Sequence, residues 1–219
     1  DFFVSNEKIA LSRETEHNER KILELSKPES FSLYVGIPFC PSRCSYCSFV
    51  MASIERAEKL IEPYTKLLCE EIKRTAEIAN KLGLRLETVY FGGGTPTTLS
   101  AEQLDTVLGT VNKSFDMSTC REFTVEAGRP DTIDIAKLFA LKENKVDRIS
   151  INPQTVNDEV LKTIGRKHTA QQFFDAFALA RKCGFTNINT DLIAGLPTDT
   201  YESFKNSVDG ILALDAECI

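Results

Sequence analysis

Three cysteines stand close together in the sequence, at Cys40, Cys44 and Cys47, with the spacing C-x3-C-x2-C. A structural zinc site uses four protein ligands, and an ordinary iron–sulfur cluster is held by four thiolates. The two histidines, His17 and His168, lie well away from these cysteines in the sequence. Soft thiolates suit iron–sulfur chemistry better than hard cations. The spacing therefore favours a 4Fe-4S cluster with one open iron, and a structural zinc site is the alternative.

A glycine run and several polar side chains are the other candidates for chemistry. Gly92–Thr95 fits neither the P-loop pattern nor G-x-G-x-x-G, so it indicates a phosphate site only weakly, and a tight turn is the plain alternative. Glu126, Gln154 and Asp191 each occur at or soon after a β-rich run. Because a carboxylate in such an apolar setting has to be paired or functional, Glu126 and Asp191 are candidates for ligand binding, and Gln154 is a candidate by its place past a strand end.

The elements that must position these residues alternate between β-rich runs and amphipathic helical stretches. Strands are predicted at residues 31–37, 86–93, 122–127, 147–153 and 188–196, and residues 217–219 begin a sixth. Helices are predicted at residues 7–25, 55–82, 100–114, 132–143, 156–163, 169–183 and 200–214. Gly83 and Gly184 stand where helices stop, and Ser100 with Gln103 has the spacing of a capping box.

This alternation predicts an α/β fold with a parallel sheet and right-handed crossovers. Ligands of such folds bind at the carboxyl ends of the strands. The cysteines, the glycine run, Glu126, Gln154 and Asp191 all fall at that edge. Their convergence favours a partial TIM-type (β/α)6 barrel, truncated at its C-terminal end, over a flat doubly wound sheet.

Length and charge exclude several classes of protein. The 219 residues are 42% hydrophobic and 26% charged, which suits one domain with a substantial core. A net charge of −6 argues against a nucleic-acid partner, which needs a basic face. No apolar run approaches the roughly 18 residues of a membrane span and no signal peptide is visible, so a cytoplasmic location is expected. Because the first residue is Asp1, the natural start is expected to lie upstream.

The remaining cysteines are scattered along the chain. Clustered cysteines of cytosolic proteins bind metal more often than they form disulfides. The scattered ones are expected to be buried small apolar residues: Cys69, Cys120, Cys183 and Cys218. Neither histidine has a partner in the sequence that would indicate a catalytic role, and no nucleophile elbow is present.

Several stretches together resemble a known family. The cysteine spacing with Tyr46 before the last cysteine is similar to the signature of radical SAM enzymes. The stretches "LYVGIPFCPSRCSYCSF", "VYFGGGTPTTLS", "RISINPQT", "IGRKHT" and "DLIAGLP" resemble the oxygen-independent coproporphyrinogen III oxidase (coproporphyrinogen dehydrogenase) family, above all its Firmicutes branch. The resemblance implies a radical SAM core domain over residues 31–219, incomplete at its end, after an N-terminal helical segment at residues 1–30.

The resemblance implies two cofactors and their ligands. A 4Fe-4S cluster is held by Cys40, Cys44 and Cys47, and S-adenosylmethionine (SAM) chelates the open iron. The family positions at the SAM site correspond here to Tyr34, Tyr46, Gly93, Gly94, Thr95, Glu126, Gln154, Arg166 and Asp191. In this interpretation the glycines let backbone groups hydrogen-bond the methionine part of SAM, and Arg166 neutralises a carboxylate. No catalytic residue is assigned beyond these ligands.

Structural alternatives stay open for part of this set. Glu126 could pair with Arg129 or Arg148, Arg166 could pair with Asp191, and Tyr34 could be an ordinary aromatic strand residue. The sequence also departs from the family pattern at four places: one extra residue in Glu126-Ala-Gly-Arg-Pro130 relative to Glu-x-x-Pro, Gly36 for a histidine, Asn152-Pro153 for Gly-Val, and Phe49 where one branch has a further cysteine.

The activity that the resemblance implies is reductive cleavage of SAM to a 5′-deoxyadenosyl radical. The radical would start the oxidative decarboxylation of coproporphyrinogen III propionates to vinyl groups in haem biosynthesis. The alternatives are a haem-binding chaperone of the same family and a radical SAM methyltransferase acting on haem. The implied partners are a tetrapyrrole, either a porphyrinogen or haem, and an electron donor such as flavodoxin or ferredoxin.

Overall fold

The computed structural model describes residues 3–49 and 52–219. The strands are β1 (Ser30–Ile37), β2 (Phe39–Cys40), β3 (Ala52–Ser53), β4 (Arg85–Gly93), β5 (Glu122–Glu126), β6 (Arg148–Ser150) and β7 (Ile188–Asn189). The helices are α1 (Asn6–Leu23), α2 (Ile54–Lys81), α3 (Ala101–Ser114), α4 (Ile135–Glu143), α5 (Asp158–Thr163), α6 (Ala170–Lys182) and α7 (Tyr201–Leu212). None of the helices in these ranges combines the length and apolar character that crossing a membrane requires.

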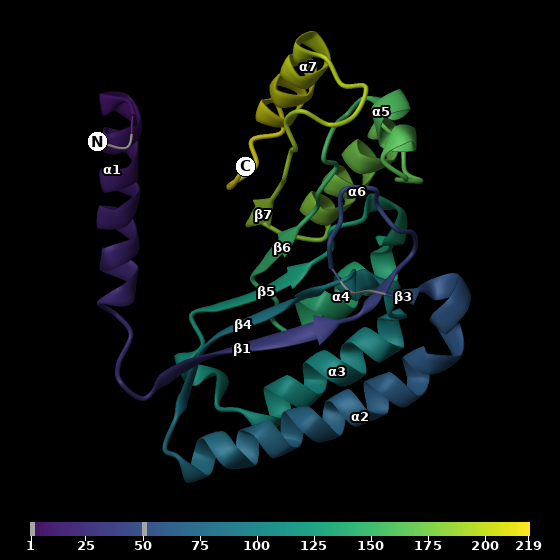
Figure 1. The fold of residues 1–219 in the computed structure, drawn as a ribbon. Coiled ribbons are helices and arrows are strands. Elements are labelled where there is room, and N and C mark those ends of the chain that lie inside the picture. Colours follow the sequence, from purple (N-terminus) through teal and green to yellow (C-terminus); the bar gives the residue numbers. More distant parts are fainter. Residues whose placement is uncertain (1–2, 50–51) are drawn as a thin grey trace.

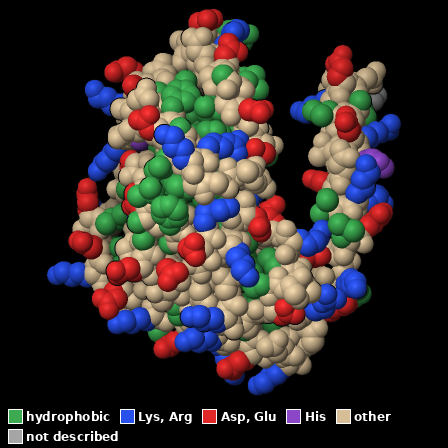
Figure 2. All heavy atoms as spheres, turned by 180° about the vertical axis from the view of Figure 1, so that it is seen from behind, with side chains coloured by type: hydrophobic (Ala, Val, Ile, Leu, Met, Phe, Trp, Pro, Cys, Tyr) green, Lys and Arg blue, Asp and Glu red, His purple; other side chains and the backbone are tan. Residues whose placement is uncertain are grey.

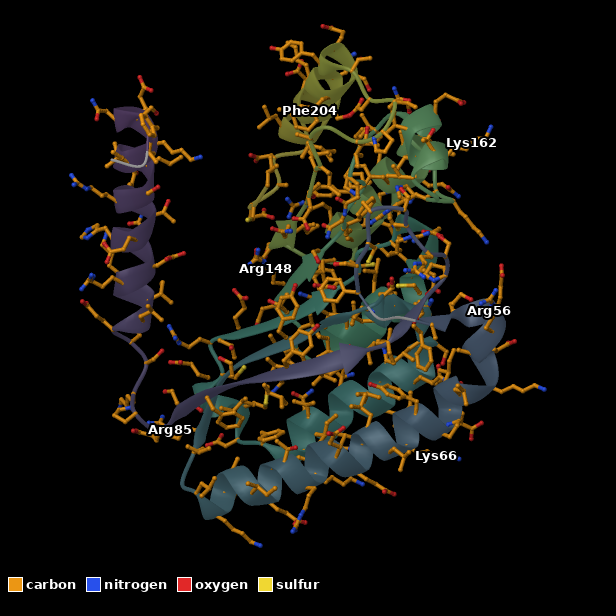
Figure 3. All side chains as sticks on the ribbon, viewed as in Figure 1. Arg56, Lys66, Arg85, Arg148, Lys162 and Phe204 are labelled. Carbon is orange, nitrogen blue, oxygen red and sulfur yellow. The ribbon has the colours of Figure 1, made fainter. Side chains whose placement is uncertain are left out.

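The main sheet is parallel, with the strand order β1-β4-β5-β6-β7. Helices α2, α3 and α4 and the pair α5–α6 each connect one strand to its neighbour (Figure 1). Figure 3 shows Arg85, at the start of β4, and Arg56, near the start of α2, at opposite ends of the sheet. The strands therefore run toward the start of α2, and the predicted α/β fold with a parallel sheet is confirmed.

The two faces of the sheet differ in polarity, because successive strand residues point to opposite sides. One face packs against the helices and forms the core with buried side chains that include Val35, Ile37, Val89, Phe91, Phe123, Val125, Ile149 and Ile188. The other face carries polar side chains that contact one another across the strands: Ser32, Tyr34, Thr88, Tyr90, Glu122, Glu126, Arg148 and Asn189. Burial against the helices therefore stabilises the fold and leaves this polar face free for ligands.

A second, two-stranded sheet lies at the carboxyl end of β1. It pairs Phe39 with Ala52 and Cys40 with Ser53 in parallel register. Strands of two residues are too short to show a period of two, so this sheet was not predicted. It contains Cys40 and thus holds one end of the segment 40–47, which we call the cysteine loop.

The helices begin and end at the capping and glycine residues that were predicted. The Ser100 side chain accepts a hydrogen bond from Gln103 N at 3.2 Å, and the Gln103 side chain accepts one from Ser100 N at 2.9 Å, which is the predicted capping box of α3. Gly83 and Gly184 have φ angles of +67° and +85°, which glycine adopts without strain. Helix boundaries could thus be predicted closely because each depends on neighbouring residues alone.

Helix α1 stands apart from the rest of the molecule. None of its residues is buried, and it runs beside the body as a separate column in both the ribbon and the space-filling view (Figures 1 and 2). A short turn connects it to β1, in which Ser30 N donates to Lys27 O at 2.9 Å. The predicted helix over residues 7–25 is confirmed, and the buried core begins with β1.

The predicted strand over residues 188–196 is wrong in its extent. β7 ends at Asn189 because its partner strand β6 ends at Ser150, and beyond this point Leu192 makes only an isolated bridge with Gln154. On its other side Asn189 makes a single bridge to Cys218, and Thr190 N donates to Cys218 O at 3.0 Å. The predicted burial of the scattered cysteines is also wrong in part. Cys69 is buried, Cys120 and Cys183 are half-buried, and Cys218 is exposed because it lies in that single bridge at the edge of the sheet.

Candidate functional site

The cysteine loop packs against the turn that follows α5. Ser45 N donates to Ile164 O at 3.0 Å, and Ser42 Oγ donates to Gly165 O at 2.9 Å. Gly165 has a φ angle of +79°, and a Cβ at this position would lie 2.8 Å from Arg43 O. Only glycine lets the two backbones approach this closely, so the "IGR" stretch forms the support of the cysteine loop.

The glycine loop (residues 92–96) also packs against the segment that carries Cys40. Gly94 N donates to Ile37 O at 2.7 Å, and Thr95 N donates to Phe39 O at 2.7 Å. A Cβ on Gly94 would lie 2.5 Å from Phe39 O, and Gly93 has a φ angle of +102°. These glycines were predicted to direct backbone hydrogen bonds to SAM. The structure instead uses the amides of Gly94 and Thr95 to hold the chain before the cysteine loop, and SAM binding by Gly93, Gly94 and Thr95 stays a prediction.

Hydrogen-bonding groups lie beside two of the three cysteine sulfurs. Cys40 Sγ is 3.3 Å from Thr95 Oγ1, and Arg129 Nη1 donates to Cys44 Sγ at 3.6 Å. Burial raises the pKa of the Cys40 thiol, while the Thr95 hydroxyl and the Arg129 charge act against that rise. Because a thiolate accepts hydrogen bonds and cannot donate one, both groups are placed to stabilise the deprotonated sulfurs that bind metals.

The cysteine loop carries three thiols, one fewer than the four ligands of a structural zinc site. Across residues 3–49 and 52–219, no three His, Cys, Asp or Glu side chains converge closely enough to hold one metal ion. A structural zinc ion needs such convergence, with thiolates about 2.3 Å from a single centre. An iron–sulfur cluster takes its thiolates on different irons, so its cysteines stand further apart. Ligation of a cluster by Cys40, Cys44 and Cys47 stays a prediction.

Arg166 is buried and connects the cysteine loop to two other segments of the site. Its Nε and Nη2 donate to Tyr46 Oη at 3.3 and 3.1 Å, and its Nη1 donates to Gly128 O at 3.1 Å and Asn152 O at 2.7 Å. Four of the five N–H groups of its guanidinium therefore bind protein atoms. Burial raises the pKa of Tyr46, and the Arg166 charge opposes the rise. The alternative of an Arg166–Asp191 ion pair is wrong for the described residues.

Glu126 ends β5 beside two tyrosines on the polar face of the sheet. Tyr90 Oη donates to Glu126 Oε1 at 2.5 Å, and the rings of Tyr34 and Tyr90 stack with their centroids 5.9 Å apart. Burial raises the pKa of Glu126; the Tyr90 hydrogen bond acts against this rise and the nearby Asp191 charge adds to it. The tyrosine pair thus orients the Glu126 carboxylate at the end of β5, where it can bind a ligand.

The predicted alternative partners of Glu126 bind elsewhere. Arg129 pairs with Asp131 at 3.2 Å, and the labelled Arg148, which begins β6 in Figure 3, lies 3.8 Å from Glu122. The alternative of an ion pair to Glu126 is therefore wrong. Arg148 does not reach Glu126 because the register of the sheet places it opposite Thr124.

Asp191 follows β7 and is exposed rather than enclosed in an apolar strand. Its Oδ1 accepts from Asn189 Nδ2 at 2.8 Å, its Oδ2 accepts from Asn152 Nδ2 at 2.8 Å, and its N donates to Asn152 Oδ1 at 3.1 Å. The two side-chain amides orient the carboxylate but do not neutralise its negative charge. Among the described residues, neither Glu126 nor Asp191 has a cationic partner, so together they form an uncompensated acidic pair.

Gln154 joins the loops that carry these groups. It is buried and has a φ angle of +70°, which is uncommon for a residue with a side chain. Its N donates to Asp191 O at 3.1 Å and its O accepts from Ile193 N at 3.0 Å. These hydrogen bonds maintain an unfavourable backbone conformation of the kind that clusters at ligand sites.

Several residues that contribute to the site were not predicted as site residues, among them Asn189, which donates to Asp191. Tyr90 shares the face of Gly92 by the alternation of β4, which could have indicated its contact with Glu126. Asn152 was noted only as a departure from the family pattern, and Arg129 only as an ion-pair partner. Both act through loops whose approach depends on the tertiary structure, so neighbouring residues gave no signal for them.

Comparison with protein families gives one match that covers most of the chain. The model described as the Radical SAM superfamily matches residues 34–211, a range that includes the cysteine loop and Asp191. The chain belongs to the radical SAM superfamily. The predicted superfamily and fold class are thereby confirmed.

Curated relatives of this radical SAM protein are of two kinds. It is 39% identical over 211 residues to the oxygen-independent coproporphyrinogen-III oxidase-like protein HemZ of Bacillus subtilis (strain 168), a match that covers 95% of the chain and 42% of the relative. It is 40% identical over 187 residues to the heme chaperone HemW of the same organism, covering 85% of the chain and 48% of the relative. The chain thus spans less than half the length of these relatives. The predicted resemblance to the coproporphyrinogen oxidase family is confirmed.

Solved structures agree with this placement. Coproporphyrinogen III oxidase (HemN) from Escherichia coli superposes with a TM-score of 0.78 at 30% identity, covering 90% of this chain and 45% of that one. The structure titled native anSMEcpe with bound AdoMet has a TM-score of 0.58 at 15% identity and covers 82% of this chain and 48% of that one. The second likeness concerns the fold alone.

Membership of the superfamily implies a 4Fe-4S cluster and SAM, and the residues present fit both groups. Soft thiols with hydrogen-bonding groups beside their sulfurs suit the cluster. The acidic pair Glu126 and Asp191 suits the ammonium and ribose hydroxyl groups of SAM, because carboxylates accept hydrogen bonds from both.

His168 lies behind this site, with a side chain that is 0% exposed. Burial lowers the pKa of His168 to about 4; the Arg166 charge also lowers it, and Asp131, at 3.9 Å from Nδ1, acts in the opposite direction. Among the described residues, neither ring nitrogen has a hydrogen-bond partner. His168 is therefore a neutral core side chain at neutral pH.

His168→Leu is expected to flatten the dependence of stability on pH in the metal-free protein. The unfolded histidine titrates near pH 6.5 and the folded one near pH 4, so between these values the unfolded chain binds a proton that the folded chain excludes. The free energy of unfolding therefore falls as the pH drops through this range, by up to about 3 kcal/mol from this group. Urea unfolding from about pH 4 to 7 measures the slope. The exposed control His17→Leu should keep the wild-type slope, and an equal slope in His168→Leu would contradict the assignment.

Proposed function

We propose that this chain is the radical SAM core of an enzyme that decarboxylates the propionates of coproporphyrinogen III to vinyl groups. The observation that carries the proposal is the position of the three thiols of the cysteine loop at the carboxyl edge of the sheet, close to the uncompensated acidic pair of Glu126 and Asp191. The likeness to the oxidase-like HemZ and to HemN supports this choice of substrate.

Each group of the site has a distinct part in holding the cofactors. Cys40, Cys44 and Cys47 would ligate the cluster, and SAM would bind beside it. When bound, these cofactors supply a hydrogen-abstracting 5′-deoxyadenosyl radical. Glu126 and Asp191 would bind the cationic and hydroxyl groups of SAM, with their carboxylates oriented by Tyr90, Asn152 and Asn189.

The remaining predicted residues would complete the walls of the SAM site. Tyr34 stacks on Tyr90, which places its ring beside Glu126 on the polar face. Gln154 fixes the backbone of Asp191 through the hydrogen bond from its N to Asp191 O at 3.1 Å. Arg166 holds Tyr46 and keeps one N–H group for a ligand carboxylate.

The overall reaction at each propionate determines which hydrogen and electron acceptors the protein needs. Conversion of –CH2–CH2–COO⁻ to –CH=CH2 releases CO2 and removes one hydrogen atom and one electron. The hydrogen atom leaves with the SAM-derived fragment, and the electron passes to an external one-electron acceptor. A reduced carrier such as flavodoxin or ferredoxin would supply the electron that reduces the cluster beforehand.

A haem chaperone is the second candidate, because the likeness to HemW is as high as that to HemZ. Identity reaches 40% with HemW of Bacillus subtilis and 41% over 191 residues with HemW of Lactococcus lactis subsp. lactis. In that case the cluster and SAM site would accompany the transfer of haem rather than its synthesis.

Turnover of coproporphyrinogen III by the whole natural protein separates the two candidates. The reconstituted protein is supplied anaerobically with SAM, a reductant and coproporphyrinogen III, and the products are analysed by mass spectrometry. Loss of CO2 with formation of vinyl groups is expected. Stable stoichiometric binding of haem without any decarboxylation would overturn the oxidase proposal in favour of the chaperone.

Cys44→Ala is expected to abolish the broad visible absorption near about 400 nm that follows anaerobic reconstitution with iron and sulfide. This absorption is charge transfer from thiolate to iron, so it requires the cysteine ligand. The exposed cysteine Cys218 offers a matched control, and Cys218→Ala should keep the spectrum. An unchanged spectrum in Cys44→Ala would contradict ligation of the cluster by this cysteine.

Asp191→Ala is expected to keep the cluster spectrum and to weaken SAM binding. A charge-assisted hydrogen bond contributes about 1.5–3 kcal/mol, so the dissociation constant should rise roughly 10- to 100-fold. Equilibrium dialysis with labelled SAM measures the change in the reconstituted chain. Asp209→Ala on the exposed side of α7 serves as the control, because its carboxylate pairs only with Lys205 in the described residues. Equal affinities in the two variants would contradict the role of Asp191.

A further inference from the structure

Arg129 is a buried cation between β5 and the cysteine loop, with a side chain that is only 3% exposed. Every N–H group of its guanidinium has an acceptor. Nε and Nη2 donate to Asp131 Oδ1 and Oδ2 at 3.2 and 3.4 Å, and Nη2 also donates to Ser42 Oγ at 3.0 Å. Nη1 donates to Ser42 O at 3.5 Å and to Cys44 Sγ at 3.6 Å. The guanidinium thus joins a carboxylate on one side to the cysteine loop on the other.

The contact with Cys44 places a permanent positive charge beside one sulfur. Arginine stays charged at any physiological pH, and the interior screens its field far less than water does. Cys40 Sγ instead has the neutral Thr95 hydroxyl beside it, at 3.3 Å. Thr95 and Arg129 therefore place one hydrogen-bonding group beside each of two sulfurs, and only Arg129 adds a charge.

The charges around Arg129 are arranged unevenly. Its counter-ion Asp131 occupies Nε and Nη2, whereas Nη1 faces the cysteine loop. His168, packed against Asp131, is neutral, and the second buried cation, Arg166, donates to Tyr46 of the same loop. The face that the cysteine loop meets is accordingly cationic.

We propose that Arg129 is a positioning residue that holds the cysteine loop and raises the reduction potential of the cluster through its hydrogen bond to Cys44. The proposal rests on the proposed function only in that a cluster must form on these cysteines. It concerns the ease of reducing the cluster, whatever substrate the protein acts on.

The physical reason is the charge that the cluster gains when it is reduced. One added electron makes the cluster and its thiolates more negative, so a cation and a hydrogen bond at the sulfur stabilise the reduced state more than the oxidised one. Reduction potentials of iron–sulfur clusters depend on such hydrogen bonds and on the neighbouring charge. Arg129 would therefore lower the driving force that the electron donor has to supply.

Potentiometric titration of the reconstituted chain, followed by electron paramagnetic resonance, tests this. Arg129→Met should make the reduction of the cluster roughly tenfold less favourable. For a one-electron reduction this corresponds to a midpoint potential that is more negative by about 59 mV. Arg129→Lys keeps the charge and loses the fork of donors, so it should lie between Arg129→Met and the wild type. Arg121→Met, at a surface ion pair with Glu87, is the matched control and should leave the potential unchanged.

Asp131→Asn gives a test of opposite sign. It removes the counter-ion and leaves the guanidinium beside Cys44, so the potential should become more positive than in the wild type. Among the described residues, Asp131 makes no hydrogen bond to the cysteine loop itself, and this variant should assemble its cluster even if Arg129→Met does not. A purely structural role would lower the cluster content and leave the potential of the remaining cluster unmoved, which would overturn the proposal.

The metal-free protein gives an independent readout of the positioning role. Amide hydrogen exchange in residues 41–47 should be faster in Arg129→Met than in the wild type, because three hydrogen bonds to the loop are lost. Unchanged exchange would overturn the positioning role. A wild-type chain that assembles no cluster overturns the proposed function itself, whereas a normal cluster with equal potentials in all variants overturns only the inference about Arg129.

Discussion

The close approach of backbone to backbone around the cysteine loop is the constraint on which the whole site depends. The loop has no long secondary-structure element of its own, so the positions of its sulfurs depend on the segments that touch it. Gly94 meets the carbonyl of Phe39, and Gly165 meets the carbonyl of Arg43, at distances that leave no room for a Cβ. Two turns far apart in the sequence thereby fix one loop, and the hydrogen bonds of Arg129 and Arg166 complete that fixation.

The elements and the edge at which ligands bind could be predicted from the sequence, because both follow from local patterns. The capping box of Ser100, the glycine stops and the alternation of strands and helices each depend on a few neighbouring residues. The roles inside the site depend on register and on loop approach. Arg166 is such a case: the family resemblance placed it at the SAM site, yet most of its donors bind Tyr46 and the carbonyls of other loops. The shortness of β7 likewise depends on tertiary structure, because its partner strand β6 ends at Ser150.

The site separates its charges in a way that matches a ligand of mixed charge. Cationic groups, Arg129 and Arg166, stand on the side of the cysteine loop, and the acidic pair Glu126 and Asp191 stands at the ends of β5 and β7. A molecule that carries both a carboxylate and cationic groups can satisfy both sides at once. The same arrangement would suit an anionic cluster, because the two guanidinium groups beside the cysteine loop are already held in place by protein acceptors.

The difference in polarity between the two faces of the sheet determines which substitutions the fold tolerates. Burial against the helices supplies the folding energy through one set of alternate strand residues, and the opposite set, which includes Tyr34, Tyr90 and Arg148, contributes little to it. Substitutions of exposed side chains on the polar face should therefore cost little stability and can alter what is bound. Relatives named as an oxidase-like protein and as a heme chaperone can therefore share one scaffold, because the helix-covered layer that keeps it folded is separate from the face that can vary.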